Sequence, residues 1–341
     1  MTLDAPSWSV VTTVDEPPAL VQTFVAWHLS LGAERVFVYC DRPDDPVADI
    51  LAHLPQVQVV LCDDAHWQRL GKSRPRRHQV RQVRNARDAY RHCTSDWLLH
   101  VDADEYLWSR KGVAPLLSAI EPDADVVIVQ VAERMHRPDD PDTSIFEGVF
   151  RRPFRKPSKM GERIFGPDYA LTYRGLTGHA HGKTFVRTGR QAEMSIHRPQ
   201  PAKGHPELIK SRPAPEAIEL LHFDGLTPTY WIYKLARMQR ALDKADGMPP
   251  SQHRRAQADA LLADPDGGQD LYRRLKHVTP NIAQRLEKHG LLFVPAFDPS
   301  AALATSFQGT AVDLTPAAMD AWLAAKKPQV VPYLWKAAKG D

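Results

Sequence analysis

The chain has 341 residues, of which 43% are hydrophobic and 25% charged, and its formal net charge is +3 at pH 7. These proportions are typical of a globular protein, and the small net charge excludes a chain that is basic throughout and binds polyanions for that reason. The length predicts one large domain with an extension, or two domains, with a sizeable hydrophobic core.

Strand and helix patterns alternate along the first 130 residues. Short apolar or β-branched runs predict strands at residues 8–14, 35–40, 57–62, 97–101 and 126–131. Apolar residues at helical spacing predict helices between them, at residues 20–31, 46–54 and 77–93. Strands that alternate with helices predict an α/β fold with a mainly parallel sheet covered on both faces.

The second half of the chain is less regular. Many of the 29 prolines lie between residues 137 and 228, which predicts a loop-rich stretch with strands only at 183–187, 193–196 and 217–223. Helices are predicted at residues 230–244, 252–262, 269–277 and 316–326. We therefore predict a domain over residues 1–228, with a loop-rich insert at 133–215, and a helical C-terminal extension over 229–341.

Acidic residues follow four successive predicted strands. They are Asp15 and Glu16, Asp41, Asp63 and Asp64, and the group Asp102, Asp104 and Glu105. Turns favour aspartate in any case. In sheets of this class, however, ligands bind beyond the carboxyl ends of the strands, so four acidic ends in succession predict a functional rim.

The segment WLLHVDADEYLW, residues 97–108, carries the strongest signal of chemistry. Side chains two positions apart on an extended strand point to the same face, which would bring Asp102 and Asp104 together. Two carboxylates on one face favour a hard divalent cation, Mg²⁺ or Mn²⁺. Such a cation neutralises the charge that develops on a departing nucleoside diphosphate.

The run RQVRNARDAYRHCTSDWLLHVDADEYLW, residues 81–108, resembles the central block of family 2 glycosyltransferases with the GT-A fold. It is most similar to the sub-group with a D-x-D-E-[FY] block, and the likeness extends over residues 8 to about 224. The second predicted strand ends in Asp41-Arg42-Pro43-Asp44-Asp45, where the family usually has Asp-Asp-Gly-Ser. The details of base recognition therefore stay open.

The resemblance implies roles for individual residues. Asp102 and Asp104 would form the metal and diphosphate site, and of the two Asp104 is preferred as the direct ligand. Asp41 would lie near the base or ribose, and Asp63 or its neighbour at the rim beside the base. In GT-A enzymes a late histidine often reaches the cation, and His222 is the best-placed candidate; His197, and the pair His179 and His181, are further ones.

Other residues are expected to complete the site. Arg84 and Asn85 lie on the predicted helix that would flank the donor, and Arg84 would neutralise the diphosphate. Lys183 follows a glycine-flanked segment and can contact a phosphate. Glu133 and Glu162 rank first as the base that deprotonates the acceptor hydroxyl.

These expectations predict a metal-dependent glycosyltransferase that moves a sugar from a nucleotide-diphosphate sugar to an acceptor hydroxyl with inversion, in polysaccharide or glycoconjugate synthesis. A nucleotidyltransferase is one alternative, although it needs a glycine-rich basic loop where residues 14–18 read VDEPP. The other is an inactive glycosyltransferase-like scaffold that binds polyanions through residues 69–91, which carry nine Lys or Arg and one acid.

The remaining features are weaker guides. Cys40, Cys62 and Cys93 fit neither a disulfide framework nor a zinc site, and we expect reduced thiols. The first eight residues lack a signal-peptide pattern, so a cytoplasmic location is expected. No motif predicts a nucleic-acid partner. The tail could dimerise or dock on a membrane surface through Trp335, and the sugar, acceptor and oligomeric state stay open.

Overall fold

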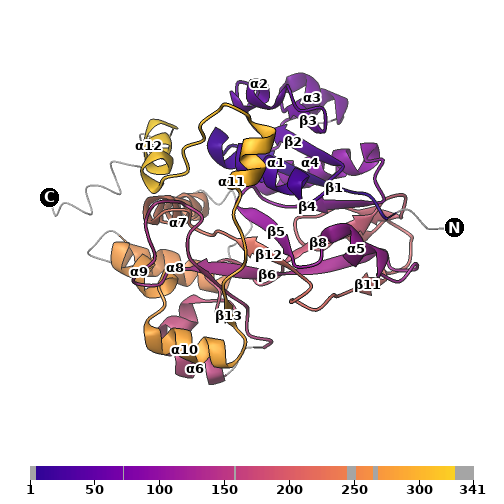
Figure 1. The fold of residues 1–341 in the computed structure, drawn as a ribbon. Helices are drawn as coiled ribbons and strands as arrows, with labels where there is room; N and C mark the ends of the chain where they lie inside the picture. The colour runs from indigo at the N-terminus through magenta and orange to yellow at the C-terminus, as the bar shows by residue number, and fades with distance from the viewer. Residues whose placement is uncertain (1–4, 72, 157–158, 244–250, 264–267, 327–341) are drawn as a thin grey trace. The chain divides into compact units, whose positions relative to one another are not determined.

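The computed structural model describes residues 5–71, 73–156, 159–243, 251–263 and 268–326. It shows an α/β protein with a large, mostly parallel sheet and flanking helices (Figure 1), which confirms the predicted fold class. The chain divides into two compact units. Unit 1 comprises Met1–Gln130, His181–Leu220 and Phe297–Val312, and unit 2 comprises Val131–Ala180, Leu221–Ala296 and Asp313–Asp341.

Parallel strands form the centre of unit 1. They run in the order β4 (Trp97–His100), β1 (Trp8–Val14), β2 (Arg35–Cys40) and β3 (Val57–Leu61). The register places Val10 opposite both Val36 and Leu99. β8 (Lys183–Arg187) then pairs antiparallel with β4 and with the first half of β6 (Val126–Met135). The carboxyl ends of β1, β2, β3 and β4 therefore lie at one edge of the sheet.

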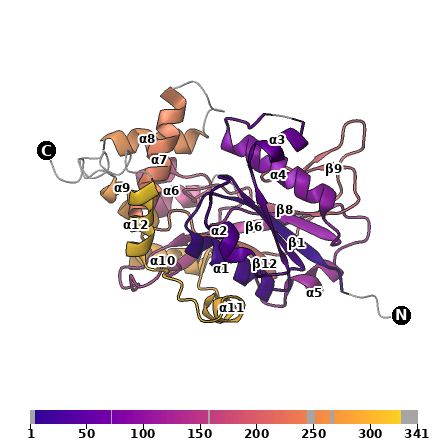
Figure 2. The ribbon, with the colours of Figure 1, turned by 90° about the horizontal axis from the view of Figure 1, so that it is seen from above.

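Helices cover both faces of this sheet. Figure 2 shows α1 (Pro18–Ser30) on one face and α4 (His78–His92) on the other. The shorter helices of unit 1 are α2 (Val47–Leu51), α3 (Asp64–Arg69), α5 (Val113–Ser118) and α11 (Ser300–Ser306). α11 packs on α1, and the ring of Phe297 lies 4.4 Å from that of Trp27. The remaining short strands are β5 (Glu105–Ser109), β9 (Ala192–Glu193), β10 (Gln200–Pro201) and β11 (Lys210–Ser211).

Unit 2 is mainly helical. Its helices are α6 (Lys159–Phe165), the 3-10 helix η1 (Gly166–Leu171), α7 (Pro228–Asp243), α8 (Gln252–Ala263), α9 (Gln269–Lys276), α10 (Pro280–Lys288) and α12 (Pro316–Lys326). The second half of β6 pairs with β7 (Val149–Arg151), which pairs with β13 (Leu292–Phe293). Apolar side chains from β6, β7, α6 and α10 form its core. β12 (Ile218–His222) begins in unit 1 and ends in unit 2.

Several sequence predictions are confirmed by these elements. β1, β2 and β8 have the predicted bounds, and the helical character of the C-terminal region is confirmed by α7 to α10 and α12. The predicted domain boundary at residue 228 falls inside unit 2 and stays a prediction. All three cysteines are free thiols, of which Cys40 and Cys62 are buried. Trp335 lies outside the described residues. Within the described ranges, no helix combines the length and apolar character that a membrane crossing requires.

Candidate functional site

The Asp102 carboxylate lies just after β4 and is held from two sides. Nε2 of Gln82, on α4, donates to Oδ1 at 2.6 Å, and Nζ of Lys183, on β8, donates to Oδ2 at 2.8 Å. The Asp102 backbone N–H donates to Oε2 of Glu105 at 3.0 Å. Burial raises the pKa of Asp102, but the charge of Lys183 outweighs it and holds the pKa well below its usual value. Asp102 is thus an oriented anion whose side chain is still 30% exposed.

Asp104 follows in a turn. The Glu105 backbone N–H donates to the Asp102 carbonyl at 3.0 Å, which closes a tight turn between β4 and β5. We predicted that Asp102 and Asp104 point to the same face because they are two positions apart on an extended strand. That reason was wrong, because the chain turns here and is not extended. Asp104 is 7% exposed. Burial raises the pKa of Glu16, at the end of β1, to about 7, and the negative charges of Asp104 and Asp15 add to that rise.

Asp41, at the end of β2, lies in an arginine clamp. Nε and Nη2 of Arg81 donate to its two oxygens at 2.5 and 2.6 Å. Nη2 of Arg74 lies 3.3 Å from Oδ2, and Nδ1 of His78 lies 3.8 Å from it. Burial raises the pKa of Asp41, yet the nearby His78 and Arg81 side chains hold it well below its usual value. This pairing fixes α4 to the end of β2.

Asn85 lies inside unit 1 and joins three elements. Its Nδ2 donates to Oγ1 of Thr13 at 3.0 Å, and its Oδ1 accepts from Nε2 of His66, also at 3.0 Å. Asp63 caps α3 by accepting from the His66 backbone N–H at 2.8 Å. Arg84 is half-buried and donates to the Ser73 carbonyl at 3.4 Å. Asn85 thus positions α4, while Asp63 and Arg84 lie nearer the surface.

A cavity of about 490 Å³ opens beyond the end of β3. Its lining residues are Asp64, Trp67, Gln68, Gly71, Ser73 and Arg74. Arg74 also donates to the carbonyl of Asp41 at 3.1 Å. The cavity therefore adjoins the arginine clamp, at the edge where the sequence predicts the base of the donor.

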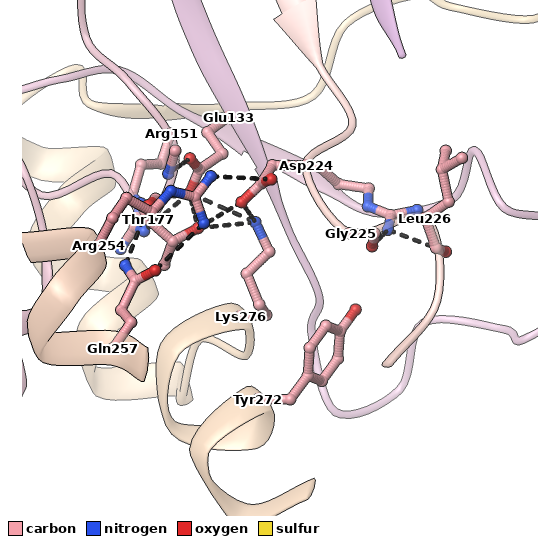
Figure 3. Close-up of polar contacts among 12 residues, drawn as sticks. Glu133, Arg151, Thr177, Asp224, Gly225, Leu226, Arg254, Gln257, Tyr272 and Lys276 are labelled. Carbon is pink, nitrogen blue, oxygen red and sulfur yellow. Dashed lines mark hydrogen bonds and ion pairs between the residues drawn. The ribbon is translucent and has the colours of Figure 1, made fainter. Parts of the chain in front are cut away.

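Glu133 begins a second polar cluster, in unit 2 (Figure 3). Its Oε1 accepts from the backbone N–H and the hydroxyl of Thr177, both at 2.8 Å, and from Nη2 of Arg151 at 3.2 Å. Its Oε2 accepts from the Gly178 N–H at 2.5 Å. Burial raises the pKa of Glu133, but the charges of Lys276 and Arg151 lower it to about 2. Both oxygens are thus engaged by protein donors.

Asp224 is the second carboxylate of this cluster. Its Oδ2 accepts from the Thr177 hydroxyl at 2.9 Å and from Nζ of Lys276 at 3.4 Å, and its Oδ1 accepts from Nη2 of Arg254 at 3.3 Å. Lys276 also lies 3.4 Å from Glu133. Both carboxylates and Lys276 are fully buried. The cluster is therefore a closed internal network that fixes the backbone at residues 177 and 178.

Two imidazoles are next to this network in the sequence: His179 follows Gly178, and His222 comes two residues before Asp224. The rings of His179 and His222 are stacked, with centroids 5.2 Å apart and planes 27° apart. A ring nitrogen of each lies within 4.8 Å of one of the other. A Cβ at Gly178 would lie 2.9 Å from both Oε2 of Glu133 and Cε1 of His222, so only glycine fits without displacing them. Glu162, in contrast, is exposed on α6.

The predicted site residues thus divide between the units. Unit 1 holds Asp41, Asp63, Arg84, Asn85, Asp102, Asp104 and Lys183, and unit 2 holds Glu133, Glu162 and His222. Asp102 and Lys183 are in direct contact, although Lys183 was expected at a phosphate. Sequence reasoning missed Gln82 and Arg81. The sequence does carry a signal for these two residues. The face of α4 that packs on the sheet, near the acidic strand ends, is polar, whereas a purely structural helix would have an apolar face there.

No protein-family model matches the sequence, and no curated protein does either. Similar solved structures include HddC from Yersinia pseudotuberculosis, with 9% identity over 67% of this chain and 97% of that one and a TM-score of 0.35. S. aureus TarS 1-349 has 13% sequence identity over 97% of this chain and 88% of that one, with a TM-score of 0.33. The 4-diphosphocytidyl-2C-methyl-D-erythritol synthase of Anaerococcus prevotii has 11% sequence identity over 54% of this chain and 72% of that one, with a TM-score of 0.29. At these low TM-scores the similarities carry no weight for the function of this chain.

Proposed function

We propose that the chain is a metal-dependent glycosyltransferase of the GT-A type, which binds a nucleotide-diphosphate sugar at the strand ends of unit 1. The observation that carries this proposal is the state of Asp102. It follows a central parallel strand, is held ionised and oriented by Gln82 and Lys183, and keeps part of its carboxylate exposed, with Asp104 two residues further on. An oriented, ionised and accessible carboxylate is what a hard divalent cation requires.

The residues present fit such a cation. Asp102 and Asp104 would hold Mn²⁺ or Mg²⁺, and when bound the cation would neutralise the diphosphate. The cavity beside Asp64 and Arg74 has room for a nucleobase, and it lies at the same edge. His222, which the sequence predicts as a further ligand, lies in unit 2 with its ring stacked on that of His179, and its role at the cation stays a prediction.

The proposed reaction is an inverting displacement. A carboxylate takes the proton of the acceptor hydroxyl, the hydroxyl oxygen bonds to the anomeric carbon, and the bond from that carbon to the diphosphate breaks, leaving its electron pair on the nucleoside diphosphate. Glu133 and Glu162 are the candidate bases. The exposure of Glu162 favours it, whereas the contacts of Glu133 favour a positioning role.

Calorimetric titration tests the donor site. UDP, GDP and dTDP are titrated, with and without Mn²⁺, into wild-type protein, Asp104→Asn and a matched control, Glu207→Gln, whose side chain is 82% exposed. We expect one nucleotide to bind only with Mn²⁺, and this binding to be lost in Asp104→Asn but kept in the control. If the folded wild-type protein binds none of the three nucleotides, the proposal fails.

The two alternatives predict other outcomes of the same experiment. A nucleotidyltransferase would bind a nucleoside triphosphate more tightly than any diphosphate. However, β1 is followed by Pro17 and by Pro18 at the start of α1, which leaves no glycine-rich phosphate loop there. A polyanion-binding scaffold would bind polyphosphate in a salt-dependent way and without Mn²⁺.

A further inference from the structure

Lys183 is a fully buried cation between two carboxylates. Its Nζ lies 2.8 Å from Oδ2 of Asp102 and 3.1 Å from Oε2 of Glu105, and the side chains of Lys183 and Glu105 have no exposed area. The ammonium group is therefore held in ion pairs with both carboxylates and is a built-in cation of the site.

The backbone fixes this ammonium group in place. Gly182 has a φ of +69°, and a Cβ there would lie 2.0 Å from the Val129 carbonyl oxygen, so the chain can enter β8 at this point only through a glycine. Lys183 itself pairs with Val129 in the sheet. Because β8 also pairs with β4, the side chain of Lys183 reaches the end of β4 from a rigid strand.

An ammonium group in this position opposes the binding of a second cation. Like charges a few ångströms apart repel strongly at the edge of a protein interior, where the effective dielectric constant is well below that of water. Lys183 balances one of the two negative charges on Asp102 and Glu105. A divalent cation at Asp102 thus meets a weaker negative potential than the number of carboxylates suggests.

We propose that Lys183 is a resident counter-cation that lowers the intrinsic affinity of the Asp102–Asp104 site for its divalent cation. The cation then binds firmly only when a diphosphate supplies further negative charge, so metal and nucleotide binding are coupled. This inference rests on the proposed function for the identity of the anion. Its electrostatic part concerns the metal alone and is tested separately.

The test measures binding of Mn²⁺ alone, from the electron paramagnetic resonance signal of free Mn²⁺. Wild-type protein is compared with Lys183→Met and with a matched control, Lys210→Met, whose side chain is 51% exposed. We expect Lys183→Met to bind Mn²⁺ about tenfold more tightly or better, and the control to match the wild type. In the variant, added UDP, GDP or dTDP should also raise Mn²⁺ affinity by a smaller factor than in the wild type.

Charge balance is tested by a second pair of variants. Glu105→Gln leaves Lys183 facing Asp102 alone and should weaken Mn²⁺ binding about tenfold, whereas the double variant Lys183→Met/Glu105→Gln should return it to the wild-type value. If Lys183→Met does not fold, the Mn²⁺ affinity of Glu105→Gln tests the proposal by itself. Unchanged or tighter Mn²⁺ binding by Glu105→Gln overturns the proposal.

Other outcomes also overturn the proposal. Unchanged, weaker or absent Mn²⁺ binding in folded Lys183→Met contradicts it, and weaker nucleotide binding with unchanged Mn²⁺ affinity would instead make Lys183 a phosphate ligand. A double variant that stays as weak as Glu105→Gln contradicts the charge balance. The proposed function fails on a different result, the absence of nucleotide binding by the wild type.

Discussion

Replacing Glu133 with glutamine should destabilise unit 2 although the two side chains have the same shape. Glutamine presents one oxygen, whereas Glu133 accepts on both: Oε1 from Thr177 and Arg151, and Oε2 from the Gly178 N–H. The new NH₂ group would therefore face another donor, and Lys276 would lose one of its two carboxylates. Breaking a buried ion pair by removing one partner costs about 3–5 kcal/mol. The fall in the pKa of Glu133 from 4.5 to about 2 corresponds to a similar value, about 3 kcal/mol.

Native-state hydrogen exchange measures this effect where it arises. The protection of the Thr177 and Gly178 amides should fall by about 3–5 kcal/mol in Glu133→Gln at pH 7. Glu162→Gln makes the same chemical change on the exposed face of α6 and should alter protection by less than about 0.5 kcal/mol. A loss below about 1 kcal/mol in Glu133→Gln, with the amides still protected, would refute the assignment of Glu133 to a structural network.

Acid should reduce the difference in stability between the wild type and Glu133→Gln. The folded-state pKa of Glu133 lies below the unfolded value, so its contribution is complete above about pH 4.5 and is lost as the pH falls toward 2. The gap in stability between the wild type and Glu133→Gln should therefore shrink from pH 4.5 to pH 2. A gap that does not change over this range would mean that the charge of Glu133 contributes nothing.

Three further substitutions test the positioning contacts by urea unfolding. Gly178→Ala places a methyl group 2.9 Å from Oε2 of Glu133 and should cost about 1–3 kcal/mol, whereas an unchanged midpoint would show that the loop has room. Asn85→Leu removes the buried hydrogen bonds to Thr13, His66 and Cys62 and should cost about 2–4 kcal/mol; a neutral result would mean that water replaces the amide. Arg81→Met leaves the buried carboxylate of Asp41 with weaker partners and should cost about 3 kcal/mol, which a stability equal to the wild type would contradict.

The fold was predictable where the local pattern alone decides the structure. β1 and β2 are runs of apolar and β-branched residues that are buried almost throughout, and such runs form central parallel strands. β5 was missed because the turn at Asp102–Glu105 carries no glycine or proline to mark it. Without such a mark, the sequence pattern did not separate Glu105–Ser109 from the acidic segment that follows β4.

The candidate site was predictable only in part, for a related reason. The acids at the strand ends of unit 1 are local features of the sequence, and Asp41 and Asp102 do lie at that edge. Their partners come from elsewhere: Lys183 lies 81 positions from Asp102 in the chain, and Lys276 lies 99 positions from Thr177. No periodicity links such residues, because only the tertiary fold brings them together.

The interleaving of the two units bears on how the protein is made. Unit 1 includes both α1 and the much later segment Phe297–Val312, and α11 from that segment packs on α1. A ribosome releases the chain from the N-terminus, and domains whose residues are contiguous can fold as they emerge. Here the packing between Trp27 and Phe297 must wait until the 270 residues that follow Trp27, up to Phe297, have been synthesised. Until then the part of α1 that packs against α11 stays uncovered, and exposed apolar surface of this kind makes a nascent chain a client for chaperones.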